Sequence, residues 1–274
     1  MFTRAIVRPP GANFSKGLTT AGLGPPDLDR ALLQHEAYCR TLVDCGLALT
    51  RLEVDGAHPD STFVEDAAVL VEGVSANRSG GPIAILTRPG AASRRGEVDS
   101  VRAALAGVLP VSALRAIESP ATLDGGDVCQ AERHFFIGIS DRTNEAGAKQ
   151  LSEFLKDAGY SSSFVDIRRT VPSVDQTSDL LHLKSGLTYL GDNRLVVTEA
   201  LADRAEFSGY ELVRVASGEE YAANCVRVND FVLIAAGYPA FGSRLQALGY
   251  KTIALEMSEF QKMDGGLSCL SLRF

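Results

Sequence analysis

The segment MDGGLSCLSLRF near the carboxyl terminus places a cysteine shortly after a glycine turn. Asp264-Gly265-Gly266 predicts the turn, and Cys269 follows at the start of a strand-like run. A thiol in this position can direct its sulfur into a cavity near backbone N–H groups. As a nucleophile it would need thiolate character, which a base or a neighbouring cation can supply. Taken alone, a buried and inert thiol is the commoner case.

One of the four histidines lies within an apolar segment, SDLLHLKSG. His182 in this segment is a candidate general acid and base, because histidine is the side chain that titrates near neutral pH. Asp124, in TLDGGDV, is a candidate for holding the imidazole of His182 in one tautomer. A core histidine with satisfied hydrogen bonds remains the alternative.

Four carboxylates flank apolar strand-like runs, and they are Asp60, Glu65 and Asp66 in PDSTFVEDAAV together with Asp124. Carboxylates are costly to bury without a partner. Four at the heads of two strands predict a cavity of negative potential that suits a cation. Solvated turns or caps are the ordinary alternative.

Two arginines follow turns, Arg94 after RPGAAS and Arg142 in SDRTNEAG. A guanidinium group suits a carboxylate because it donates two parallel hydrogen bonds. Carboxylates at one end of a cavity and arginines at the other would fit a zwitterionic amino acid with a cationic side chain. Each arginine alone is equally typical of a solvated surface or a cap.

The elements that must position these residues recur along the chain. A short apolar strand is followed by a tight turn, a second strand, an amphipathic helix and a third strand. The units begin near Asp66, Asp124, His182, Asn224 and Cys269, which are 58, 58, 42 and 45 residues apart. Repeats of this size indicate an array of supersecondary units.

The repeats favour a closed ring. A chain of 274 residues is short for an open solenoid with polar caps, whereas a ring of about five units leaves no exposed sheet edge. The first strands would then surround the axis, and residues at their ends would meet in one central cavity. A doubly wound sheet is the alternative, but GLGPP at 22–26 does not make a G-x-G-x-x-G phosphate loop.

Composition limits the partners. The net charge of −7 argues against nucleic acid or an anionic membrane surface, because both need a basic face. We also find neither a signal-peptide pattern nor an apolar run that would span a bilayer. The cysteines are odd in number and form no C-x-x-C pair, which predicts free thiols in the cytoplasm: Cys39, Cys45, Cys129, Cys225 and Cys269.

Seven motifs together resemble the dimethylarginine dimethylaminohydrolase family over nearly the whole chain: FVEDAAV, TRPGAASRR, TLDGGDV, ISDRTNEAGA, LHLKS, AANC and DGGLSCLSLRF. The dipeptide Cys269-Leu270 resembles bacterial members. The resemblance implies a single catalytic domain over residues 1–274, folded as a five-fold pseudosymmetric α/β propeller of ββαβ units. It implies hydrolysis of a methylated arginine to citrulline and an alkylamine.

The resemblance also implies roles for individual residues. Cys269 resembles the nucleophile, His182 the general acid and base, and Asp124 its acidic partner. The expected substrate contacts are Asp66 and Glu65 at the guanidinium, Arg94 and Arg142 at the α-carboxylate, and Asp60, the backbone of Leu18 and the backbone of Met263 at the amino-acid end. The loop NFSKGLTTAGLGPP resembles a mobile lid.

We expect no metal and no cofactor, because a cysteine and a histidine without a third ligand do not make a structural zinc site. The expected partner is a small cationic amino acid, and a homodimer is left open. The rival activities are deimination of unmethylated arginine or agmatine and amidinotransfer. A non-catalytic propeller is the rival from another class of protein.

Overall fold

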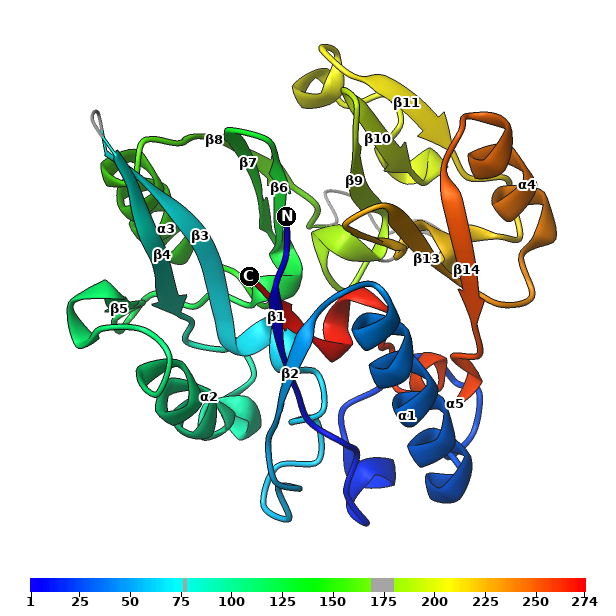
Figure 1. Cartoon of the computed structure of the whole chain (residues 1–274), viewed down its shortest axis with the longest axis horizontal. Helices are drawn as coiled ribbons and strands as arrows, with labels where there is room; N and C mark the ends of the chain where they lie inside the picture. The colour runs from blue at the N-terminus through cyan, green and yellow to red at the C-terminus, as the bar shows by residue number, and fades with distance from the viewer. Residues whose placement is uncertain (76–77, 169–179) are drawn as a thin grey trace.

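The computed structural model describes residues 1–75, 78–168 and 180–274. In these ranges, fifteen strands form five three-stranded sheets. Figure 1 shows the sheets arranged around the centre of the molecule, near which both chain ends lie. The predicted α/β propeller is therefore confirmed. None of the described helices has the length and apolar character needed to cross a membrane.

The strands and helices have the following bounds. The strands are β1 Arg4–Val7, β2 Ala48–Arg51, β3 Ala68–Ser75, β4 Arg78–Leu86, β5 Leu114–Ala116, β6 Val128–Ala131, β7 His134–Ile139, β8 Ser161–Asp166, β9 Leu187–Gly191, β10 Arg194–Val197, β11 Glu211–Arg214, β12 Val226–Val228, β13 Phe231–Ala235, β14 Lys251–Leu255 and β15 Leu272–Arg273. The helices are α1 Leu28–Asp44, α2 Glu97–Ala106, α3 Glu145–Asp157, α4 Pro239–Ala247 and α5 Ser258–Gln261.

The unit β6-β7-α3-β8 shows how the sequence builds one repeat. Strands β6 and β7 form an antiparallel hairpin, and β8 returns parallel to β7. Helix α3 begins where the side chain of Asn144 accepts a hydrogen bond from the N–H of Gly147. Its buried face includes Ala148, Leu151 and Leu155, whose spacing places them on one side of the helix. The crossover therefore covers the outer side of the sheet with an apolar surface.

The two chain ends close the ring. Strand β15 pairs antiparallel with β1, and β1 pairs parallel with β2. Helix α1 lies between β1 and β2 in the sequence, so the fifth unit has the same order of elements as the others. The segment that carries Cys269 is thus fixed by hydrogen bonds to the N-terminal strand.

The third unit, β9-β10-β11, departs from the repeat. Between β10 and β11 the pattern predicts an amphipathic helix, but the structure has two 3-10 turns, Glu199–Leu201 and Ala205–Phe207. Leu201 and Phe207 are both buried in the same apolar cluster. Six residues apart on an α-helix, they would point about 120° away from each other. The two turns instead bury both side chains in one cluster.

The first strands enclose an axial cavity of about 500 Å³. Each of the five sheets contributes to its lining, through Val69, Val128, Thr188, Val226 and Leu272. Glu65, Gly125, Lys184 and Ser268, from the turns that precede these strands, also line it. The strand ends therefore meet around a common axis as expected, but this cavity is not lined by Asp66, Asp124, His182 or Cys269.

Candidate active site

The candidate residues share one local structure. In every unit a short 3-10 turn precedes the first strand: Val64–Ala67, Gly125–Asp127, Leu183–Ser185, Glu220–Ala223 and Ser268–Leu270. Each turn has a backbone hydrogen bond between residues three apart, such as Ser185 N–H to the carbonyl of His182 at 3.0 Å. Glu65, Asp66 and Cys269 lie within these turns, and Asp124 and His182 come directly before them. The repeated turn therefore presents all five side chains at the same end of the ring.

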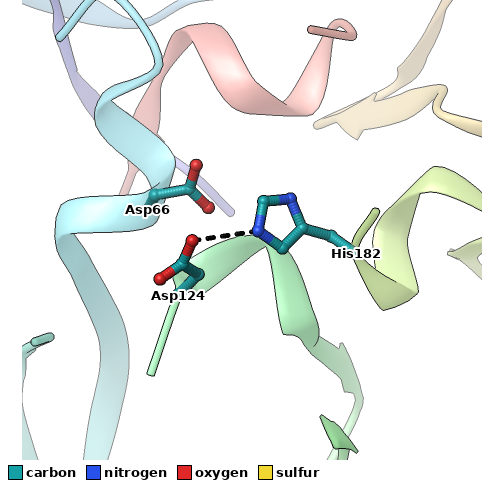
Figure 2. Close-up of side chains that lie close together, drawn as sticks. All are labelled: Asp66, Asp124 and His182. Atoms are coloured by element: carbon teal, nitrogen blue, oxygen red, sulfur yellow. Dashed lines mark hydrogen bonds and ion pairs between the residues drawn. The ribbon is translucent and has the colours of Figure 1, made fainter. Parts of the chain in front are cut away.

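His182 and Asp124 form a buried pair. The Nε2 atom of His182 lies 3.0 Å from Oδ2 of Asp124 (Figure 2). The other oxygen of Asp124 accepts a hydrogen bond from the N–H of Gly90 at 2.8 Å. Asp124 is fully buried and His182 is 8% exposed. The carboxylate is fixed on both sides, so it holds the imidazole in one orientation.

Asp66 faces the same pair. Its Oδ2 lies 2.6 Å from Nη1 of Arg94, and its Oδ1 accepts from the N–H of Gly126 at 2.8 Å. Figure 2 shows its carboxylate beside the imidazole of His182. A Cβ at position 126 would lie 2.8 Å from the ring of His182 and 2.9 Å from Oδ1 of Asp66. Only glycine fits there, which explains the glycine in the motif that follows Asp124.

The charges around His182 favour its imidazolium form. Burial opposes that charge, but the carboxylates of Asp66, Asp124 and Asp127 outweigh it and raise the pKa of His182 to about 9. Burial likewise opposes the charge of Asp66, while His182 and Arg94 hold the pKa of this carboxyl below its usual value. At neutral pH His182 therefore carries a proton that it can donate.

Asp66, Asp124 and His182 also have the composition of a metal site, since their nearest ligand atoms lie within 4.8 Å of one another. A histidine must be neutral to bind a metal, and the pKa of His182 is raised. Both carboxylates already accept hydrogen bonds. A metal ion at this position would therefore have to displace the proton of His182.

Cys269 is the one cysteine of the five that is not fully buried. Its sulfur accepts a hydrogen bond from the N–H of Gly266 at 3.4 Å. Burial, followed by the charges of Glu65 and Asp66, raises the pKa of this thiol to about 12. The protein alone therefore holds Cys269 as a thiol at neutral pH, and a cation beside the sulfur would favour the thiolate.

Glu65 is committed to a different contact. Its carboxylate lies 2.5 Å from Nζ of Lys184 and accepts from Oγ of Ser268 at 2.7 Å. Because Ser268 precedes Cys269, Glu65 supports the turn that carries Cys269 from the side of the axial cavity. Sequence reasoning missed Lys184 and Ser268, although both lie beside predicted site residues.

The predicted amino-acid end brings together Leu18, Asp60 and Met263. The N–H of Leu18 donates to both carboxylate oxygens of Asp60, at 3.0 and 3.2 Å. A Cβ at Gly17 would lie 2.3 Å from Asp60 and 3.1 Å from the side chain of Met263. The Met263 side chain is buried in the apolar core, and its N–H donates to Phe260. Within the described part of the chain, the carbonyl groups of Leu18 and Met263 accept no backbone hydrogen bond and can contact a ligand.

The two predicted arginines differ. Arg94 donates from Nε and Nη2 to Glu97, from Nη2 to the carbonyls of Asp60 and Phe63, and from Nη1 to Asp66. This leaves one N–H, on Nη1. The half-buried Arg142 makes no side-chain hydrogen bond or ion pair within residues 1–75, 78–168 and 180–274. Its charge nevertheless acts on Asp60, so Arg142 lies near the amino-acid end with its guanidinium available.

Two further residues brace the site. Asp127 is fully buried and accepts from Ser140 and Thr143 at 2.6 Å each and from the N–H of Leu183 at 2.9 Å. It thereby fixes the turn next to His182. The side chain of Asn224 joins the turns of His182 and Cys269, through the carbonyl of Lys184 at 3.0 Å and the N–H of Ser268 at 2.9 Å. For Asp127, the signal available in the sequence was its position three residues after Asp124.

The pKa of His182 predicts how stability depends on pH. A base whose folded pKa is raised stabilises the fold fully below its ordinary value of 6.5 and loses this contribution as pH rises through about 9. The free energy of unfolding should therefore fall by on the order of 3 kcal/mol between these values. Urea unfolding of the wild type and of His182→Gln tests this. Parallel pH curves for the two proteins would contradict the raised pKa.

Known proteins of similar sequence and structure can now be compared with this site. The chain is 39% identical over 274 residues to N(G),N(G)-dimethylarginine dimethylaminohydrolase of Pseudomonas aeruginosa, with both chains fully covered. It is 34% identical to the Streptomyces coelicolor protein of the same name, over 98% of this chain and 96% of the relative. A mutant of the Pseudomonas aeruginosa protein, solved in complex with citrulline, superposes with a TM-score of 0.89 at 39% identity, with full coverage of both chains.

No protein-family model matches the sequence. The full-length identity to two named relatives nevertheless agrees with the fold and with the motifs that surround the ring. The chain belongs to the dimethylarginine dimethylaminohydrolase family.

Proposed function

We propose that this chain hydrolyses Nω-methylated arginine to citrulline and an alkylamine by covalent catalysis at Cys269. The main observation in support is that turns at one end of the ring place both a partly exposed thiol, Cys269, and a protonated imidazole, His182, which is paired with Asp124. The citrulline complex of the Pseudomonas aeruginosa relative supports the product. Asp66 supplies the buried negative charge that a guanidinium cation needs.

The first half of the reaction forms a covalent adduct. The substrate guanidinium binds against Asp66, and its positive charge lowers the pKa of the Cys269 thiol, so that the thiol releases its proton to solvent and the thiolate forms. The sulfur attacks the guanidinium carbon and a C–S bond forms. The bond from this carbon to the methylated nitrogen then breaks, and His182 donates its proton to the departing amine.

The second half returns the enzyme to its first state. His182 is now neutral and takes a proton from a water molecule, whose oxygen attacks the carbon of the thiouronium adduct. The C–S bond breaks, the proton of the added hydroxyl passes to the departing sulfur as the C=O of citrulline forms, and the enzyme again holds a thiol at Cys269 and a protonated His182. Asp124 and Asp66 stabilise the imidazolium at both ends of the cycle.

The remaining contacts select an amino acid. Arg142, with the one uncommitted N–H of Arg94, binds the α-carboxylate. Asp60 and the carbonyls of Leu18 and Met263 accept hydrogen bonds from the α-ammonium group. Glu65 does not contact the substrate but accepts a hydrogen bond from Ser268, which precedes Cys269. The proposal treats residues 1–274 as one catalytic domain. It places the protein in the cytoplasm, where free thiols persist. It leaves a homodimer open.

Arg142→Ala should raise the KM for methylarginines by at least about 30-fold, because loss of a charge-assisted contact to a carboxylate costs about 2 kcal/mol or more. The value of kcat should change little, since Arg142 does not contact the reacting carbon. Arg95→Ala, at a neighbouring exposed arginine, is the matched control. Wild-type KM in Arg142→Ala would assign the carboxylate to another group.

The function itself is tested by incubation with arginine, monomethylarginine, symmetric and asymmetric dimethylarginine and agmatine, with assay of citrulline and of the released amine. The proposal predicts citrulline and an alkylamine in equal amounts from a methylated substrate. Turnover of arginine alone would show an arginine deiminase, and agmatine turnover would remove the need for Arg142. Amidine transfer to an added amine would show a transferase. Absence of any turnover would favour the non-catalytic propeller.

A further inference from the structure

Glu97, at the first position of helix α2, is a buried carboxylate with no part in the mechanism above. It is 3% exposed, and among the described residues its carboxylate accepts hydrogen bonds from Arg94 alone. Both oxygens lie 3.1 Å from Nε of Arg94, and Oε2 lies 2.8 Å from Nη2. Burial of a carboxylate is costly, so this two-point contact needs a reason.

The contact fixes the plane of the guanidinium group. Nε and Nη2 of Arg94 are held by Glu97, and Nη2 also donates to the carbonyls of Asp60 and Phe63. A guanidinium is planar, so the position of Nη1 follows from the other two nitrogens. Nη1 then lies 2.6 Å from Asp66. Glu97 thus determines where Arg94 meets the guanidinium-binding carboxylate.

The contact also sets the charge at Asp66. Charges alternate from Glu97 through Arg94 and Asp66 to His182, and all four side chains are buried. Arg94 without a counter-ion would neutralise Asp66 and weaken its attraction for a second cation. With Glu97 ionised, Arg94 and Glu97 together carry no net charge, and the charge of Asp66 remains for a ligand.

We infer that Glu97 is a positioning residue for the guanidinium end of the substrate. By neutralising Arg94 and fixing its plane, it keeps the negative charge of Asp66 available to the substrate guanidinium and to His182. This inference rests on the proposed function for its kinetic consequences, but its effect on His182 belongs to the protein alone.

The surroundings of Glu97 give the inference a pH signature. Burial and the carboxylates of Asp60 and Asp66 raise its pKa to about 7, against the opposing charge of Arg94. Other charged or titratable groups nearby are Arg8, with Asp55 at 4.0 Å from it, and His58, which lies against Gly96. As pH falls through about 7, Glu97 takes up a proton and the wild type should approach the behaviour of Glu97→Gln.

The decisive variant is Glu97→Gln, which keeps the shape and removes the charge. We expect kcat/KM at pH 8 to fall about 10- to 100-fold, mainly through KM, for methylarginine substrates. A fall in kcat/KM should persist for an analogue without the α-carboxylate, whereas the effect of Arg142→Ala should disappear with that analogue. The step near pH 7 in kcat/KM of the wild type should disappear. Asp99→Asn, an exposed acid in the same helical turn, is the control.

A second measurement does not depend on turnover. The pKa of His182, measured by NMR titration of its ring, should fall in Glu97→Gln because Arg94 is left without its counter-ion. An unchanged His182 pKa together with wild-type kinetics in Glu97→Gln would overturn the inference. If the wild type turned over no guanidine substrate, the proposed function would fail, and the His182 titration would still decide the role of Glu97.

Glu97→Asp serves if Glu97→Gln does not fold. It keeps the charge but has a lower intrinsic pKa, so the step near pH 7 should move to lower pH, with kcat/KM at pH 8 restored to within a few-fold of wild type. A step that stays in place in Glu97→Asp would assign it to another group and refute the positioning role.

Discussion

Cys269→Ser is expected to lower kcat by more than about 100-fold, because a covalent route normally contributes several orders of magnitude to the rate. The reason lies in the protonation states of the site. The pKa of His182 is raised to about 9, so at neutral pH the imidazole is an acid and cannot deprotonate a hydroxyl. The thiol needs no such base once the substrate cation lies beside it. A serine hydroxyl is far less acidic, and the same cation is insufficient to ionise it.

The fold and substrate binding should survive this change. The sulfur accepts one long hydrogen bond, from Gly266 at 3.4 Å, and an oxygen can replace it at little cost. Calorimetric titration of Cys269→Ser with asymmetric dimethylarginine should therefore show binding without citrulline release. Cys45→Ser, at the end of α1, is the matched control and should remain active. More than a hundredth of wild-type kcat in Cys269→Ser would remove Cys269 from the role of nucleophile.

The repeat explains why much of this arrangement could be predicted from sequence. Asp66, Asp124, His182 and Cys269 each open a unit, and a closed ring brings unit heads together whatever their separation along the chain. The pair of His182 and Asp124, 58 residues apart, follows from this symmetry. The repeat predicts one amphipathic helix in each unit, and α1, α2, α3 and α4 confirm it in four units. The prediction is wrong between β10 and β11, where two 3-10 turns bury Leu201 and Phe207.

The partners of the charged residues could not be predicted in this way. Glu65 meets Ser268 across 203 residues and Lys184 across the axis, and no local pattern relates them. The sequence around Arg94 does not distinguish binding to a carboxylate of a ligand from binding to a carboxylate of the protein. Only the fold shows that Glu97, three residues away, accepts hydrogen bonds from Nε and Nη2 of Arg94. The turn Asp264-Gly265-Gly266 was visible, whereas the 3-10 turn that carries Cys269 depends on contacts with Asn224 from another unit.

Asp66→Asn is expected to have the broadest effect of any single substitution in this site. An amide has one acceptor oxygen and one donor group, whereas Asp66 accepts from both Arg94 and the N–H of Gly126. One of these donors would then face an N–H₂ group, and the buried charge of Arg94 would keep only Glu97 as its counter-ion. We expect the free energy of unfolding to fall by about 2 kcal/mol or more, since a buried charge loses a partner.

The catalytic effect of Asp66→Asn should be larger than its effect on stability. The substrate guanidinium loses its counter-charge, so KM rises, and the substrate no longer lies where it lowers the pKa of Cys269. Asp66 is also the largest source of the raised pKa of His182, so the proton of the general acid is held less firmly near neutral pH. Together these losses should lower kcat/KM by more than about 1,000-fold.

Asp124→Asn provides the comparison that separates these roles. Asp124 contacts His182 and Gly90 but does not contact Arg94, so its amide variant should lower kcat with little change in KM. Steady-state kinetics of both variants at pH 8, with Asp99→Asn as a surface control, measure the split. Asp66→Asn with a wild-type KM would show that the guanidinium binds elsewhere, and Glu65, despite its ion pair with Lys184, would then be the carboxylate to test next.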